Sequence, residues 1–285
     1  MNYRKKFVVK PGAKVALAQI DPAYTGKHAS HAAAASDIGK CVERMNKLQY
    51  RMYADGSRSL LVVLQGPDAS GKDGVIRHVF RGVSPQGVSV CAFKAPSEIE
   101  RAHDFLWRVH RRAPGKGELV IFNRSHYEDV LIVRVRKLVP RSVWSKRFDR
   151  INEFERMLAD NGTQLLKFYL HISPQEQLER FAQRLDDPWR HWKISESDYA
   201  ERELWPQYVE AYEDAIARTS TERAPWYVIP ANHKWFRDLA VSHIIAATMD
   251  EMGLKRPPAR VDIAAIRAKY HAAAAKARNA RHGKK

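Results

Sequence analysis

The spacing of two glycines and a lysine near residue 70 is typical of a loop that binds phosphate. Gly66, Gly71 and Lys72 form the pattern G-x-x-x-x-G-K. Glycines at these positions let backbone N–H groups approach phosphate oxygens, and the lysine reaches the outer phosphates. A helix predicted from Lys72 to Arg81 would direct its positive end at the same anion. The expected phosphate-binding positions of this loop are Gly66, Ala69, Ser70, Gly71, Lys72, Asp73 and Gly74.

Two acids distinguish this loop from the usual pattern. Asp73 stands where Ser or Thr normally ligates magnesium, and Asp68 lies inside the loop. A carboxylate so close to bound phosphates would repel them unless a divalent cation lay between. We therefore expect Asp68 to bind Mg²⁺, or Mn²⁺ in its place. The alternative is a glycine-rich turn that only joins a strand to a helix, and a second phosphate-type segment downstream favours the binding role.

That second segment follows a predicted buried strand at 118–122. Nucleotide-handling proteins with such a loop usually end this strand in an acid that helps to hold magnesium, but here the residue is Asn123. Its carbonyl oxygen is a second candidate metal ligand. Arg124 and Arg134 are expected to clamp phosphoryl oxygens, and Glu128 to position magnesium or a substrate hydroxyl. Acids at a helix N-terminus also simply favour the helix dipole.

A third basic segment is predicted to form a lid at about 180–203. Arg180 and Arg184 lie four residues apart on one helix. Arginines at this spacing repel each other unless an anion sits between them. We therefore expect them to close over phosphates and exclude water. The alternative is a solvated basic face, because Glu176 and Glu179 are near in sequence.

The elements that must position these residues indicate an α/β domain. Short apolar runs that end at Gly, Pro or polar residues predict strands buried on both faces of a parallel sheet, and apolar residues every three or four positions predict helices. Lys94 would then lie at the carboxyl end of a strand, where ligands of such sheets collect. Ser97 and Glu100 form a capping box that predicts a helix through about His110. The predicted strands are 60–65, 88–94, 118–122, 164–172 and 226–229, and the longer predicted helices are 32–53, 142–160 and 233–252.

Length and composition define the domains and the cellular setting. The 285 residues, 45% of them hydrophobic, suit one large α/β domain at 31–253, preceded by an irregular arm at 1–30 and followed by a basic tail at 254–285. Two cysteines are too few for a disulfide framework, which predicts a reducing, cytoplasmic setting. No window approaches the ~18 apolar residues of a membrane span.

The net charge of +17 favours a polyanionic ligand. Residues 254–285 contain ten Lys or Arg and the single acid Asp262, so the tail carries +9 and the rest of the chain +8. A basic body attracts polyanions by electrostatic steering, which salt weakens. The tail is either solubilising or an accessory anion-binding arm.

Other common chemistries lack their motifs. The twelve histidines show no ligand spacing for zinc. A G-x-S-x-G elbow and a G-x-G-x-x-G turn after a strand are both missing, so hydrolase-triad and dinucleotide-binding functions have no support.

Four ordered motifs resemble those of polyphosphate kinase family 2. They are G-P-D-A-S-G-K-D-G at 66–74, F-K-A-P-S with H-D-F-L-W-R at 93–108, F-N-R-S-H-Y-E-D-V at 122–130, and A-P-W-Y-V-I-P-A with K-W-F-R at 224–237. The form N-R-S-H-Y-E-D most resembles the class III branch, whose members phosphorylate both AMP and ADP from polyphosphate. Other branches usually have Asp at the position of Asn123.

The resemblance implies a three-layer α/β/α P-loop kinase fold with a central parallel sheet and a helical lid. It also implies magnesium dependence, purine nucleotides AMP, ADP and ATP as partners of inorganic polyphosphate, and a homo-oligomer of two or four chains. By the same resemblance Asp68 binds metal, Lys72 and the loop backbone hold the transferring phosphates, Arg124 clamps them, and Arg180 and Arg184 belong to the lid.

These observations lead us to expect reversible phosphoryl transfer between polyphosphate and nucleotides, from AMP to ADP or from ADP to ATP. Such transfer needs no strong base because the attacking phosphate oxygen is already ionised. One alternative is a nucleotide kinase that uses ATP alone, and another is a nucleic-acid-binding protein that uses the basic tail. We do not expect a nucleic-acid partner, because RNA-binding aromatic motifs and a helix-turn-helix pattern are missing.

Overall fold

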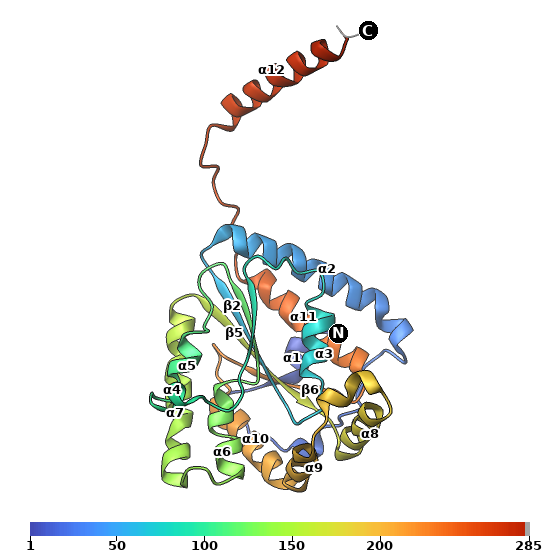
Figure 1. Cartoon of the computed structure of the whole chain (residues 1–285), viewed down its shortest axis with the longest axis vertical. Coiled ribbons are helices and arrows are strands. Elements are labelled where there is room, and N and C mark those ends of the chain that lie inside the picture. Colours follow the sequence, from blue (N-terminus) through green and yellow to red (C-terminus); the bar gives the residue numbers. More distant parts are fainter. Residues whose placement is uncertain (283–285) are drawn as a thin grey trace. The chain divides into compact units, whose positions relative to one another are not determined.

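The computed structural model describes residues 1–282, and the last three residues of the predicted tail, 283–285, lie outside the described residues. The chain divides after Leu254 into two compact units. The larger unit holds a six-stranded sheet between two layers of helices (Figure 1). This arrangement confirms the predicted three-layer α/β/α architecture.

Five strands of the sheet are parallel, and the short edge strand is antiparallel. The strand order is β1-β6-β5-β2-β4-β3, with β2 paired to both β4 and β5. In the register, Val63 of β2 lies opposite Phe122 of β4 and Lys167 of β5. The strands are β1 (Val8–Val9), β2 (Ser59–Gln65), β3 (Val88–Ala92), β4 (Leu119–Asn123), β5 (Thr163–His171) and β6 (Trp226–Pro230).

Alternate side chains of the central strands pack into two separate cores. Leu60, Val62 and Leu64 of β2 point to one face, which α1, α2, α3 and α11 cover, whereas Leu61 and Val63 point to the other, which α5, α6, α7 and α10 cover. A strand buried on both faces reads as a continuous apolar run. The helices of the larger unit are α1 (Tyr3–Phe7), α2 (His31–Asp55), α3 (Lys72–Val79), α4 (Glu98–Arg101), α5 (Trp107–His110), α6 (Ile132–Val135), α7 (Arg141–Asp160), α8 (Pro174–Leu185), α9 (Glu196–Glu203), α10 (Trp205–Thr219) and α11 (Lys234–Glu251), with 3₁₀ turns η1 (Leu17–Gln19), η2 (His126–Asp129) and η3 (Pro188–Lys193).

The carboxyl ends of the parallel strands meet at one edge of the sheet. The loop after β2, the turn after β4 and the start of α8 after β5 therefore lie together, because β2 is the neighbour of both other strands. Ligands of open α/β sheets bind at this edge.

Two predicted segments differ from the structure. The arm at 1–30 is not wholly irregular: α1 buries Tyr3 and Phe7, and β1 pairs antiparallel with β6. The predicted helix from Ser97 to His110 has its capping box but breaks into α4 and α5. The side chain of Asp104 accepts the N–H of Leu106 between them, and this local bond competes with helix continuation.

In its described residues the smaller unit contains one helix, α12 (Ile263–His282), after a segment without regular secondary structure. The described side chains of α12 are almost all exposed, including Ile263, Ile266 and Tyr270. Among the described residues, no helix has the length and apolarity needed to cross a membrane.

Candidate active site

Two glycines allow the loop between β2 and α3 to turn tightly and to lie close against other parts of the chain. Gly66 and Gly71 have φ of 147° and 101°, a region that L side chains rarely adopt. A Cβ on Gly66 would lie 2.8 Å from the carbonyl oxygen of Leu170, and one on Gly71 would clash with the guanidinium of Arg237. The first N–H groups of α3 have no partner within the helix, so this loop is built to bind an anion.

Lys72 folds back onto this loop. Its Nζ donates to the carbonyl oxygens of Gly66, at 2.7 Å, and Pro67, at 3.1 Å. Burial and the nearby Arg124 lower the pKa of Lys72 to about 8, against the opposing pull of Asp68. The ammonium of Lys72 is therefore held at the loop. A phosphate that bound there would raise the pKa of Lys72 toward its ordinary value.

Asp68 joins the loop to the turn after β4. Its Oδ1 lies 2.8 Å from Nη2 of Arg124. Arg124 has φ of 62°, and its backbone N–H bonds to the carbonyl of Leu64 in β2. Burial disfavours the charged guanidinium, but Glu128 and Asp68 outweigh it and raise the pKa of Arg124. The sequence predicted separate roles for these two residues and did not predict this ion pair, which brings the loop acid and the strand-end cation together.

Asp73 lies between β4 and the lid segment. Its carboxylate accepts from Nδ2 of Asn123, at 2.9 Å, and from Nζ of Lys193 in η3, at 3.1 Å. Although partial burial acts in the opposite direction, these two bonds lower the pKa of Asp73. The residue that replaces the usual Ser or Thr therefore connects the end of β4 to η3.

Glu128 lies beneath the same cations. Burial raises the pKa of Glu128, and the charges of Arg124 and Lys72 partly offset this rise. Gln65, the last residue of β2, hydrogen-bonds to Ser125 at 3.1 Å and lies 3.4 Å from the hydroxyl of Tyr212. Glu128 is thus close enough to both cations of the site for their charges to act on it.

Arg180 contacts the phosphate-binding loop through hydrogen bonds to backbone carbonyls, which its spacing from Arg184 did not predict. Its guanidinium donates to the carbonyls of Ala69 and Ser70 in the loop and of Ala231 and Asn232 after β6, and its Nε pairs with Glu176. The five donors of an arginine are thereby occupied. The prediction that Arg180 needs an anion to relieve repulsion from its neighbour was wrong, because protein oxygens satisfy it.

Three other predicted phosphate ligands have different surroundings. Arg184 donates to the carbonyl of Lys193, at 2.7 Å. Arg134 pairs with Glu210, at 2.6 Å, and Asp214, at 2.5 Å, on α10. Lys94 is exposed after β3, and its carbonyl accepts from Arg108. The structure therefore brings Asp68, Lys72, Asp73, Asn123, Arg124 and Glu128 together, and shows no contact of Arg134, Arg184 or Lys94 with the loop among the described residues.

Two residues that shape the loop were not among the predicted site residues. Gln177 of α8 donates to the carbonyl of Asp68, at 3.0 Å. Arg237 of α11 packs against Gly71 and Gly74 and pairs with Asp238. Arg237 ends the K-W-F-R motif, which is the one sequence signal that pointed to it. The glutamine carries no such signal.

The acids at the loop suit a cation that is shared with phosphates. Among residues 1–282, no group of three or more His, Cys, Asp or Glu side chains is arranged to enclose a metal. Mg²⁺ typically takes only one or two carboxylates and completes its shell with phosphates and water. Asp68 retains one carboxylate oxygen outside its bond to Arg124, and Asn123 retains its carbonyl oxygen. This donor set fits Mg²⁺.

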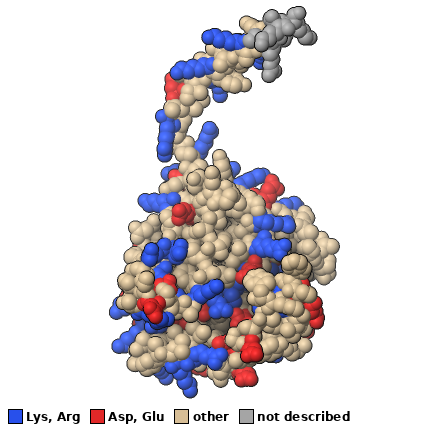
Figure 2. All heavy atoms as spheres, in the orientation of Figure 1, with Lys and Arg blue, Asp and Glu red and all other residues tan. Residues whose placement is uncertain are grey.

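The surface charge of the body is mixed. Figure 2 shows Lys and Arg side chains spread over the visible face, with Asp and Glu side chains among them. The visible face therefore carries both signs of charge, with no single isolated basic patch.

Comparison with known proteins gives consistent matches over nearly the whole body. Residues 28–257 match the family model described as Polyphosphate kinase 2. The AMP/ADP-polyphosphate phosphotransferase of Meiothermus ruber is 53% identical over 254 residues, which cover 89% of this chain and 95% of that protein. The ADP-polyphosphate phosphotransferase of Rhodopseudomonas palustris is 43% identical over 275 residues, covering 90% and 94%.

A solved structure has the same fold. The crystal structure of Polyphosphate Kinase 2 from Arthrobacter aurescens TC1 superposes with a TM-score of 0.91 at 40% identity, covering 95% of this chain and 96% of that one.

Proposed function

Because the chain belongs to the polyphosphate kinase 2 family, we propose that it transfers a phosphoryl group reversibly between inorganic polyphosphate and the nucleotides AMP and ADP. The observation that supports this most is the meeting of Lys72, Asp68 and Arg124 at a glycine-shaped loop. A polyphosphate carries roughly one charge per unit, which suits a basic body. Relatives named for AMP, ADP or both support the two acceptors.

The site residues divide the work of binding and alignment. The N–H groups at the start of α3 and the ammonium of Lys72 hold the phosphates at the point of transfer. Arg124 neutralises charge on the moving phosphoryl group, while Asp68 and Glu128 orient Arg124. The attacking oxygen belongs to a nucleotide phosphate that is already ionised, so no side chain needs to remove its proton. Exchange of one phosphoanhydride for another makes the reaction reversible.

A magnesium ion is part of this proposal. Asp68 and Asn123 would hold it, and when bound it would neutralise charge between the loop acids and the phosphates. Within the predicted lid at about 180–203, η3 and α9 would cover the site, with Lys193 and Asp73 in contact when the lid lies over α3. We further propose a cytoplasmic homo-oligomer of two or four chains; both cysteines are free thiols, which suits a reducing compartment.

An assay without ATP tests the proposed function. Purified protein is incubated with Mg²⁺, polyphosphate and either AMP or ADP, and the nucleotides are separated by chromatography. We expect ADP to form from AMP and ATP to form from ADP. An ATP-only nucleotide kinase would give no product until ATP was added.

The basic tail is the observation that favours a second candidate, nucleic-acid binding. That function predicts salt-sensitive binding of RNA or DNA that disappears when residues 255–285 are deleted, together with no phosphotransfer. Phosphotransfer that survives the deletion would exclude it as the main function.

A further inference from the structure

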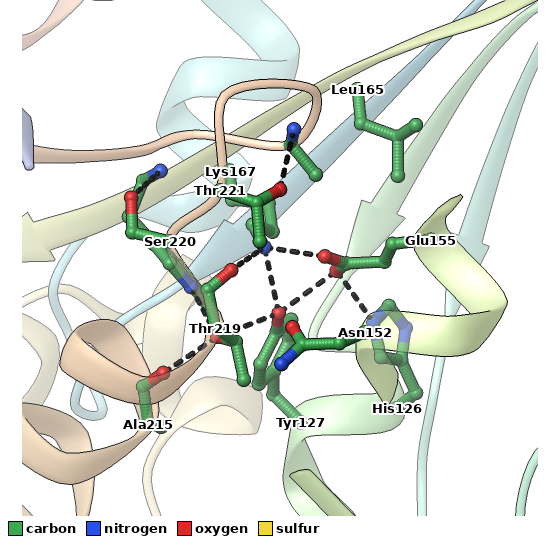
Figure 3. A network of polar contacts seen from close by, with 12 residues as sticks. His126, Tyr127, Asn152, Glu155, Leu165, Lys167, Ala215, Thr219, Ser220 and Thr221 are labelled. Carbon is green, nitrogen blue, oxygen red and sulfur yellow. Dashed lines mark hydrogen bonds and ion pairs between the residues drawn. The ribbon is translucent and has the colours of Figure 1, made fainter. Parts of the chain in front are cut away.

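A group of fully buried charged side chains lies beneath the site and takes no part in the chemistry described above. Lys167 of β5 is 0% exposed and Glu155 of α7 is 1% exposed. Figure 3 shows them at the centre of a polar network that also contains His126, Tyr127 and Thr219. Burying two charges is costly unless every donor and acceptor is satisfied.

The ammonium of Lys167 has a full set of partners from three elements. Its Nζ donates to Oε2 of Glu155 at 2.5 Å, to the carbonyl of Thr219 at 2.7 Å and to the hydroxyl of Tyr127 at 2.9 Å. A lysine has three donors and no acceptor. These bonds tie β5 to α7, α10 and η2 at one point.

Glu155 extends the network to the turn that follows β4. Its Oε1 lies 2.8 Å from the hydroxyl of Tyr127 and 3.1 Å from Nε2 of His126. An ionised carboxylate only accepts hydrogen bonds, so Nε2 of His126 donates in this contact. Burial acts against ionisation, but Lys167 and His126 lower the pKa of Glu155.

The residues held in this way stand directly beside those that face the loop. Tyr127 precedes Glu128, and His126 lies two residues after Arg124. Ser125, between them, accepts from Gln65 at the end of β2. His126 and Tyr127, in the middle of this turn, are thus bonded into the network, while Arg124 at its start bonds to Asp68 of the phosphate-binding loop.

This turn needs an external hold because its backbone is strained. Arg124 has φ of 62°, which costs energy for a residue with a Cβ and persists only where the surroundings impose it. Packing alone could be provided by apolar side chains, which often replace buried ion pairs without loss of stability. Directed bonds fix orientation in a way that apolar contacts do not.

We propose that Glu155 and Lys167 are positioning residues for phosphoryl transfer: they lock the turn from Arg124 to Glu128 in the geometry that presents Arg124 to the phosphates with Glu128 beside it. This inference rests on the proposed function. It predicts that the pair affects turnover far more than it affects stability.

The test compares three full-length forms: wild type, Glu155→Leu with Lys167→Met, and Glu155→Gln with Lys167→Met. The Leu/Met pair removes both charges together and leaves no unpaired ion, so we expect it to melt within about 5 °C of wild type. Its kcat should nevertheless fall by about 10- to 100-fold, because the turn is no longer held. The Gln/Met pair keeps an oxygen for Tyr127 and His126 and should recover most of the lost turnover.

Hydrogen exchange supplies a readout independent of activity. In the Leu/Met protein the amides of 124–129 should exchange at least about tenfold faster, while those of the central strand β2 stay protected. The matched control is Ser59→Ala with Thr163→Val, which removes a buried pair of hydroxyl groups 2.9 Å apart. This pair joins the amino ends of β2 and β5, away from the carboxyl ends where the site lies. This control should leave kcat and exchange at 124–129 unchanged.

Wild-type turnover and unaltered exchange at 124–129 in the Leu/Met protein would overturn the inference. If the Leu/Met protein does not fold, the Gln/Met protein decides. Full kcat with normal exchange at 124–129 supports positioning by hydrogen bonds. A loss of kcat that disappears when the assay is run at lower temperature shows a role in stability alone. Absence of phosphotransfer in wild type would instead overturn the proposed function.

Discussion

The carboxylate of Asp68 and the guanidinium of Arg124 lie 2.8 Å apart and join the phosphate-binding loop to the turn after β4. The two residues are 56 positions apart in the chain. They meet because β2 and β4 are adjacent parallel strands whose carboxyl ends coincide. Among the hydrogen bonds of residues 1–282, Arg124 donates only this one from its side chain, which leaves other N–H groups for phosphoryl oxygens.

Replacing Lys72 by methionine should lower kcat by roughly 10²- to 10³-fold, because the loop loses the cation that stabilises the transferring phosphoryl group. Lys72 is buried and bonded to loop carbonyls, so methionine, which is only one atom shorter, disturbs the loop less than alanine would. Steady-state kinetics with saturating polyphosphate measure the effect. The exposed Arg77 of α3 is the matched control, and Arg77→Met should keep near-normal turnover. Equal turnover in both variants would remove Lys72 from the mechanism.

The same lysine predicts a pH dependence. Its pKa of about 8 means that the free protein loses this charge as pH rises through 8, so kcat/KM for polyphosphate should fall by about tenfold per pH unit above that value. In the pH profile of kcat, the fall should begin at a higher pH than in the profile of kcat/KM, because bound phosphate favours the charged form of Lys72. Since the unfolded lysine keeps its proton to about 10.5, the contribution of Lys72 to the free energy of unfolding should rise with pH between these values.

Lys72→Arg provides the control for this profile. An arginine stays charged throughout the range, so the alkaline limb should disappear even where the absolute rate is lower. A limb at the same pH in the arginine variant would assign the titration to another group.

Asn123→Asp should strengthen the binding of magnesium. The substitution replaces a donor 2.9 Å from Asp73 by a second carboxylate, and two facing carboxylates attract a cation. We expect half-saturation at a lower Mg²⁺ concentration and an altered ratio of activity with AMP to activity with ADP. Identical magnesium and nucleotide profiles would show that Asn123 does not face the metal.

Arg180→Met should destabilise the protein by about 3 kcal/mol, because four carbonyl oxygens and Glu176 lose their shared donor in a buried place. Urea unfolding monitored by fluorescence measures the change. Arg184→Met, on the same helix, removes a bond to one carbonyl and should cost less than about 1 kcal/mol. Similar losses in the free energy of unfolding for the two variants would contradict the role of Arg180 in stabilising the loop.

Local patterns in the sequence were enough to place the loop and its strand. The apolar run at 60–65 and the glycines after it carry their own signal, and the observed β2 and α3 begin and end within two residues of the prediction. Asp68 was identifiable as an acid inside the glycine loop, and Asn123 and Arg124 because they come directly after the predicted strand 118–122 at the edge where ligands bind.

Long-range partners were not identifiable. Arg134 pairs with Glu210 and Asp214, which lie 76 and 80 residues away, so its spacing after β4 could not show that its charge is already compensated. Arg180 likewise bonds to carbonyls about 50 residues distant. Backbone oxygens have no sequence signature, and for this reason the spacing of the two lid arginines suggested an anion where the protein provides its own acceptors.

A crystal structure of the protein with Mg²⁺ and a short polyphosphate would test the central claim most directly. The account predicts a phosphate of the chain against the N–H groups at Gly71 and Lys72, with Lys72 and Arg124 contacting its oxygens. A polyphosphate bound elsewhere, with the turn that begins at Gly66 free of phosphate, would contradict it.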